Sequence, residues 1–167
     1  MRVAISGSRR VPVAVRPVVT RLIESVPEPD EWTTGGAYGI DTLAAECGKH
    51  TWPRAWHRLV YPQGERWNEG LLADDIFDEL VPVVGGYLKR DEALVTYGDV
   101  LIAFPSTTKW QPRSGTWATI RRANLIDIPI CIIPLDTIAD ASECAITDCL
   151  ESHRNPLFDG QTHDKPM

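Results

Sequence analysis

The chain has 167 residues, of which 43% are hydrophobic and 24% charged, and its formal net charge is -6. This length suits one domain with a real core, and the acidic balance argues against broad adhesion to nucleic acid or to acidic membranes. No apolar run reaches the ~20 residues that a membrane span needs. The opening residues, MRVAISGSRR, contain no apolar signal-peptide core, so we expect a cytoplasmic protein.

The first half of the chain predicts three short strands, at 2–6, 32–34 and 57–62, separated by helices at 14–26 and 40–50. The first helix carries apolar residues at helical spacing, with Pro17 in its first turn. The stretch 63–86 is less regular. There we expect a helix near Asn68–Leu80 and a short strand at 81–84.

The second half predicts a helix at 88–97, a continuous apolar strand at 99–105, a helix from 114 to about 125 and a strand at 128–134. A peripheral helix follows, and residues 151–167 read as a mobile tail after a single domain at 1–150. Strands that alternate with helices and read as unbroken apolar runs indicate a fold of the α/β class, with a central, mostly parallel sheet covered by helices on both faces.

Ligands of such sheets bind at the carboxyl ends of the strands, near the point where the strand order reverses. Three predicted strands end there in glycine and hydroxyl residues before a helix, and a helix N-terminus suits an anion such as phosphate. We therefore predict ligand-binding residues in these three loops, joined by Arg90: Gly7, Ser8, Arg9, Gly35, Gly36, Ala37, Gly39, Asp41, Pro105, Ser114, Gly115 and Thr116.

Each of these features also has a purely structural interpretation. Tight strand-to-helix turns use glycine regardless of ligand. Asp41 could stabilise a helix dipole or accept a hydrogen bond from a ribose or base, and Arg90 could be a solvated helix charge or a phosphate clamp. The loops match neither GxGxxG nor a Walker loop. The four cysteines form no CxxC pair, the four histidines are scattered, and we expect neither a metal site nor a cofactor.

Several stretches together resemble the SLOG superfamily: VAISGSR, GGAYGID, RDEAL, DVLIAFP and SGTWATI, in this order between residues 2 and 133. This superfamily includes the LOG-type nucleotide phosphoribohydrolases and the DprA/Smf DNA-processing proteins, and the pattern is most similar to the small YspA-like group. The resemblance implies a Rossmann-like three-layer fold, a homodimer, and a nucleotide or nucleotide-derived ligand whose phosphate lies near Gly115 and Thr116.

The chain departs from the LOG-type motif PGGxGTxxE, because Thr119 stands where its catalytic glutamate would be. Arg90 stands where the arginine of those enzymes would be, and Asp91 or Glu92 could replace the glutamate. We therefore expect a nucleotide-binding sensor, carrier or sequestering protein. The alternatives are a nucleotide N-glycosidase that uses Arg90, Asp91 and Glu92, and a DprA-like single-stranded DNA binder, against which the acidic charge counts.

Overall fold

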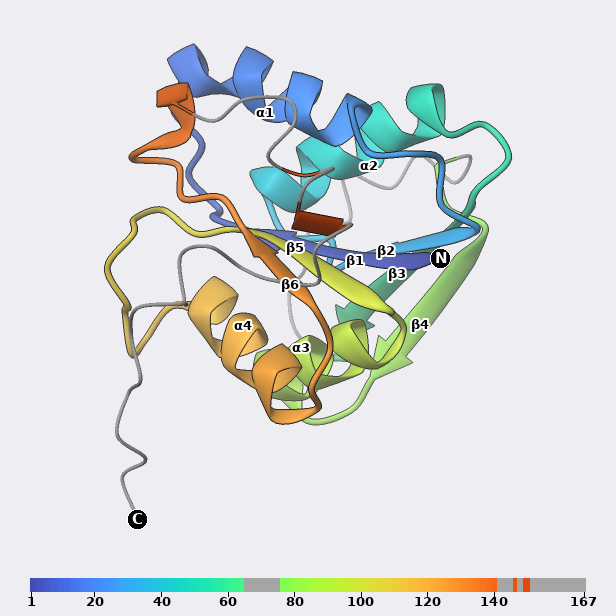
Figure 1. The fold of residues 1–167 in the computed structure, drawn as a ribbon. Helices are drawn as coiled ribbons and strands as arrows, with labels where there is room; N and C mark the ends of the chain where they lie inside the picture. Colours follow the sequence, from blue (N-terminus) through green and yellow to red (C-terminus); the bar gives the residue numbers. More distant parts are fainter. Residues whose placement is uncertain (65–75, 141–145, 147–148, 151–167) are drawn as a thin grey trace.

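A computed structural model describes residues 1–64, 76–140, 146, 149 and 150. Its centre is a six-stranded sheet in the order β4-β3-β2-β1-β5-β6, in which every neighbouring pair is parallel (Figure 1). The strands are β1 (Arg2–Gly7), β2 (Glu31–Thr34), β3 (Trp56–Pro62), β4 (Glu79–Val83), β5 (Val100–Phe104) and β6 (Ile130–Ile132).

Helices cover both faces of this sheet. Figure 1 shows α1 and α2 on one face and α3 and α4 on the other. The helices are α1 (Arg16–Glu24), α2 (Ile40–Thr51), α3 (Gly86–Thr96) and α4 (Gly115–Leu125), with short 3-10 turns η1 (Val13–Val15) and η3 (Ile138–Asp140). The predicted three-layer, Rossmann-like α/β fold is thus confirmed. None of the described helices is long and apolar enough to cross a membrane.

The two layers of helices create two hydrophobic cores, and β1 contributes to both. Val3 and Ile5 point into the core beneath α1 and α2, whereas Ala4 points into the core beneath α3 and α4. All five residues of β5 are buried. Because these strands are covered on both faces, they appear in the sequence as continuous apolar runs rather than as alternating patterns.

Three predicted segments differ from the structure or fall outside the described residues. The expected helix at Asn68–Leu80 lies largely at 65–75, outside the described residues, and its end is wrong because β4 already begins at Glu79. This edge strand starts with the charged residue Glu79, which pairs with Arg58 of β3 at 2.7 Å. Because its first residue is charged, the strand start carries no apolar signal in the sequence. After Leu135 the described residues contain η3, while the expected tail at 151–167 lies outside them.

Candidate functional site

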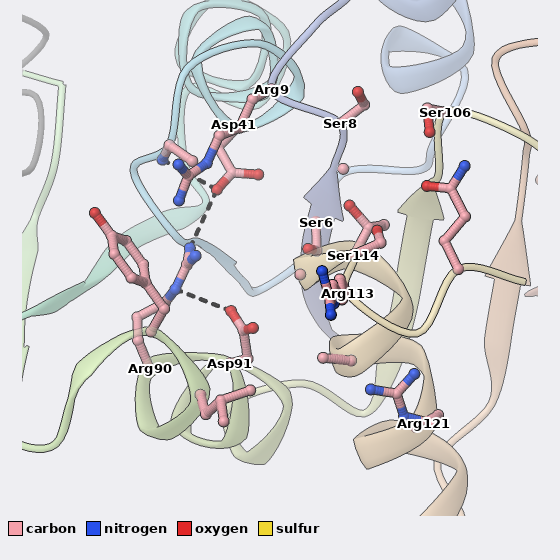
Figure 2. A pocket seen from close by; sticks show the side chains of 18 of the residues that line it. Ser6, Ser8, Arg9, Asp41, Arg90, Asp91, Ser106, Arg113, Ser114 and Arg121 are labelled. Atoms are coloured by element: carbon pink, nitrogen blue, oxygen red, sulfur yellow. Dashed lines mark hydrogen bonds and ion pairs between the residues drawn. The ribbon is translucent and has the colours of Figure 1, made fainter.

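A pocket of about 740 Å³ lies where the strand order of the sheet reverses, between β1 and β5. The chain leaves these neighbouring strands toward opposite sides, and such divergence opens a crevice in parallel sheets. Figure 2 shows the surroundings of the pocket: the end of β1, the start of α2, the first turns of α3, and the loop that leads into α4.

Positive charge dominates the lining of this pocket, although the chain as a whole is acidic. Two aspartates, Asp41 and Asp91, also line it. The positive side chains are five arginines: Arg9, Arg10, Arg90, Arg113 and Arg121. Such a concentration of positive charge in one cleft attracts anionic ligands.

The start of α4 forms one wall and adds a positive dipole end to the arginines. Ser114 caps the helix, and its hydroxyl accepts a hydrogen bond from the Trp117 amide at 3.4 Å. A Cβ atom on Gly115 would meet only Asp91 Oδ2, at 3.9 Å, so the first turn is not screened by a side chain. Backbone amides at a helix start, next to arginines, suit a phosphate group.

Arg90 lies at the centre of a buried ion-pair network on the opposite wall (Figure 2). Its Nη1 donates to the Gly35 carbonyl at 2.9 Å and lies 3.4 Å from Asp41 Oδ2. Its Nε lies 3.0 Å from Asp91 Oδ1. A Cβ on Gly35 would overlap Nη1. Arg90 is therefore a buried anchor, not a solvated helix charge.

Burial raises the pKa of both carboxyl groups in this network. For Asp91 it raises the pKa to about 6; Arg90 and Arg9 act against that rise, and Asp41 adds to it. For Asp41, burial raises the pKa, while the charge of Arg90 and backbone N–H groups, including that of Ala37 at 3.1 Å from Oδ2, lower it. Asp91 is therefore a carboxyl group that titrates close to neutral pH inside a pocket.

Most residues predicted to bind the ligand do come together around this pocket. They are Gly7, Ser8, Arg9, Ala37, Asp41, Arg90, Ser114, Gly115 and Thr116, joined by the catalytic candidate Asp91. Five predicted residues do not line it: Gly35, Gly36, Gly39, Pro105 and Glu92. Glu92 instead pairs with Lys89 at 2.8 Å on an exposed part of α3.

The glycines outside the lining have structural roles that explain their identity. Gly35 leaves space for the Arg90 guanidinium. Gly39, with φ of +88°, packs directly against the backbone of Ser8 and Arg9, which holds the start of α2 against the loop after β1. Gly35 and Gly39 in the bend after β2 thus position Arg90 and α2, while Ala37 is the residue of the bend that lines the pocket.

Sequence reasoning missed several lining residues. Arg121 follows Gly115 and Ala118 at intervals of three along α4, so helical spacing places the three on one face. Tyr87 had no such signal; its ring lies 4.9 Å from the Arg9 guanidinium and 5.8 Å from that of Arg90. The other missed residues are Ser6, Arg10, Leu88, Ser106, Gln111 and Pro112.

No model of a known protein family matches the sequence, and no curated protein matches it significantly. Solved structures do match its fold. DNA processing protein A (DprA) from Streptococcus pneumoniae aligns with a TM-score of 0.66 and 19% identity over 92% of this chain and 57% of its own. The chain therefore has the same Rossmann-like fold as this structure. It spans little more than half of the pneumococcal protein.

Two further structures share this fold. DprA from Helicobacter pylori aligns with a TM-score of 0.60 and 19% identity over 93% of this chain and 74% of its own. The Moco carrier protein of Chlamydomonas rheinhardtii gives a TM-score of 0.56 and 16% identity over 91% and 95% of the two chains. The Helicobacter structure is described as binding single-stranded DNA, so these comparisons do not support the expectation that nucleic acid is an unlikely partner.

Proposed function

We propose that the chain binds a nucleotide or nucleotide-derived ligand in this pocket, as a sensor, carrier or sequestering protein. The observation that carries the proposal is the presence of five arginines and a helix start in one pocket, at the strand-order reversal of an acidic protein. The ligand phosphate would accept hydrogen bonds from the first-turn amides of α4, at Gly115 and Thr116. Arg113 and Arg121 would add charge-assisted hydrogen bonds.

Binding without turnover is our first choice because Thr119 carries no carboxylate into the pocket. Its side chain is 1% exposed and its hydroxyl donates to the Gly115 carbonyl at 3.1 Å. One observation favours hydrolysis of a nucleotide N-glycosidic bond as a second candidate. Asp91 brings a carboxyl group with a pKa of about 6 into the pocket, where a general acid or base would work at neutral pH.

One surface feature favours single-stranded nucleic acid as a further candidate ligand. Trp110 is 52% exposed next to the lining residues Gln111 and Pro112, and the Arg121 guanidinium lies 5.7 Å from its ring centroid. An exposed aromatic ring next to a phosphate-binding pocket is a stacking platform for a base. Salt-dependent binding of an oligonucleotide, lost in Trp110→Ala, would favour this candidate over a free nucleotide.

The test is incubation of the protein with a panel of AMP, the other nucleoside monophosphates, NAD, ADP-ribose and cyclic nucleotides, read by mass spectrometry. A ligand retained unchanged supports binding, and release of free base supports the hydrolase. If nothing is retained or changed, the proposal is wrong. Arg113→Ala and Arg121→Ala should each weaken retention about tenfold. The matched control is Arg54→Ala, because Arg54 is exposed and pairs with Glu28 outside the pocket.

Two expectations accompany this proposal. A homodimer and a cytoplasmic location both remain predictions. Light scattering on the purified protein measures the first directly, and a mass of twice 18.6 kDa is the expected result.

A further inference from the structure

Asp91 presents to the pocket a hydrogen-bond acceptor that has no donor among the described residues. The residue is 5% exposed and lines the pocket. Its Oδ1 lies 3.0 Å from Arg90 Nε, whereas Oδ2 takes part in no hydrogen bond with the described residues. Figure 2 shows the carboxyl group between α3 and α4, on the inner side of α3. Oδ2 is not among the fully buried side-chain atoms without a partner, so it is open to the pocket, where water or a ligand group can donate to it.

The second feature is the position of this acceptor relative to the expected phosphate. Asp91 Oδ2 lies 3.9 Å from the point where a Cβ on Gly115 would stand. The carboxyl group of α3 therefore reaches the first turn of α4. A phosphate bound at that turn would have Asp91 as a neighbour, so the group attached to the phosphate could reach this carboxyl group. A second phosphate there would meet a negative charge, whereas a hydroxyl group would find an acceptor.

We propose that Asp91 accepts a hydrogen bond from a ribose hydroxyl, so that the pocket selects ribonucleotides over deoxyribonucleotides. This inference rests on the proposed function and names the ligand class of the same site. In a nucleoside 5'-phosphate the sugar is the group that follows the phosphate, and its 2'- and 3'-hydroxyl groups are neutral donors. They fit the combination of an anion site at α4 and a carboxylate next to it.

Arg90 is the positioning residue in this arrangement. It contacts the Gly35 carbonyl, Asp41 and Asp91 at once, so it fixes the Asp91 carboxyl group from behind. The charged groups that act on Asp91 are Arg90 and Arg9, which favour its ionised form, and Asp41, which disfavours it. From α4, the uncharged Gly115 faces Asp91 Oδ2.

The experiment is calorimetric titration of AMP, 2'-deoxy-AMP and 3'-deoxy-AMP into wild type, Asp91→Ala and Asp91→Asn, with the corresponding guanosine, cytidine and uridine nucleotides if AMP does not bind. We expect wild type to bind the ribonucleotide at least about tenfold more tightly than one of its deoxy forms, the usual contribution of a hydrogen bond to a charged group. Asp91→Ala should reduce this ratio to about one. Glu92→Gln, a neighbour outside the pocket, should leave it unchanged.

Each outcome decides the matter. Nucleotides that bind wild type with no ribose preference, or a preference that survives in Asp91→Ala, overturn this inference and leave the proposed function intact. If none of these nucleotides binds, this inference is wrong, and if no member of the wider panel is retained either, the proposed function is wrong too. If Asp91→Ala does not fold, the isosteric Asp91→Asn takes its place, with the ratio measured at pH 5 and pH 8. In wild type the preference should shrink at the lower pH as Asp91 takes up a proton, and in the Asn variant the ratio should not depend on pH.

Discussion

Substitution of Gly35 by alanine should disrupt the buried network from a position that does not line the pocket. The added Cβ would overlap Arg90 Nη1 and lie 2.8 Å from Cζ and 2.9 Å from Asp41 Oδ2. The guanidinium must then leave the Gly35 carbonyl, and Asp41 loses its buried partner. Overpacking costs about 1–3 kcal/mol, and removal of one partner from a buried ion pair about 3–5 kcal/mol. Because Arg90 can keep its contact with Asp91, we expect a loss of about 3 kcal/mol.

Urea denaturation of Gly35→Ala measures this loss, with Gly64→Ala as the matched control. A Cβ on Gly64 would meet nothing within 4 Å, and its φ of +81° adds only local backbone strain. That control should lose about 1–2 kcal/mol. If Gly35→Ala is as stable as wild type, or no less stable than the control, the Arg90 network does not depend on the open space at Gly35 and the reasoning is refuted.

Three further predictions concern pH and the helix start. Burial, with the ring stacked on Trp32, lowers the pKa of His57 to about 3, below its ordinary value of about 6.5. The unfolded chain therefore takes up a proton at His57 before the folded protein does, and the free energy of unfolding falls as pH drops below 6.5. From pH 7 to 5 wild type should lose about 2 kcal/mol more than His57→Phe in urea titrations. Asp91 acts with the opposite sign, because its pKa of about 6 in the folded protein lies above the value in the unfolded chain. From pH 5 to 8 the free energy of unfolding of wild type should fall by about 1.4 kcal/mol relative to that of Asp91→Asn, and an equal pH dependence of the two proteins would contradict this. Gly115→Ala has room for its methyl group and should not lower thermal stability, yet it should weaken nucleotide binding, because the methyl group enters the space of the phosphate.

The fold could be predicted from the sequence because the strands that decide it are covered on both faces. Runs such as DVLIAFP are typical of central strands in a helix-covered sheet, and the parallel arrangement places the loops that follow them at one edge. The same logic predicts that Ser8, Asp41 and Ser114 lie together, and all three line the pocket.

The predicted site was incomplete where side chains, not backbone turns, decide the lining. A glycine at a strand end looks the same in the sequence whether it approaches a ligand or makes room for an arginine, as Gly35 does for Arg90. The edge strand β4 is half exposed, so its composition resembles that of a loop. Arg121 lines the pocket because it lies on the same face of α4 as Gly115. Helical spacing predicts this position once the start of α4 is known to be Gly115.

The most direct test of the account is calorimetric titration of the retained nucleotide into wild type, the double variant Arg113→Ala/Arg121→Ala, and the control Arg54→Ala. The account predicts that wild type and the control bind with the same affinity and that the double variant binds about 100-fold more weakly, because each lost charge-assisted hydrogen bond removes about a factor of ten. A double variant that binds as tightly as wild type would contradict the placement of the ligand at the start of α4.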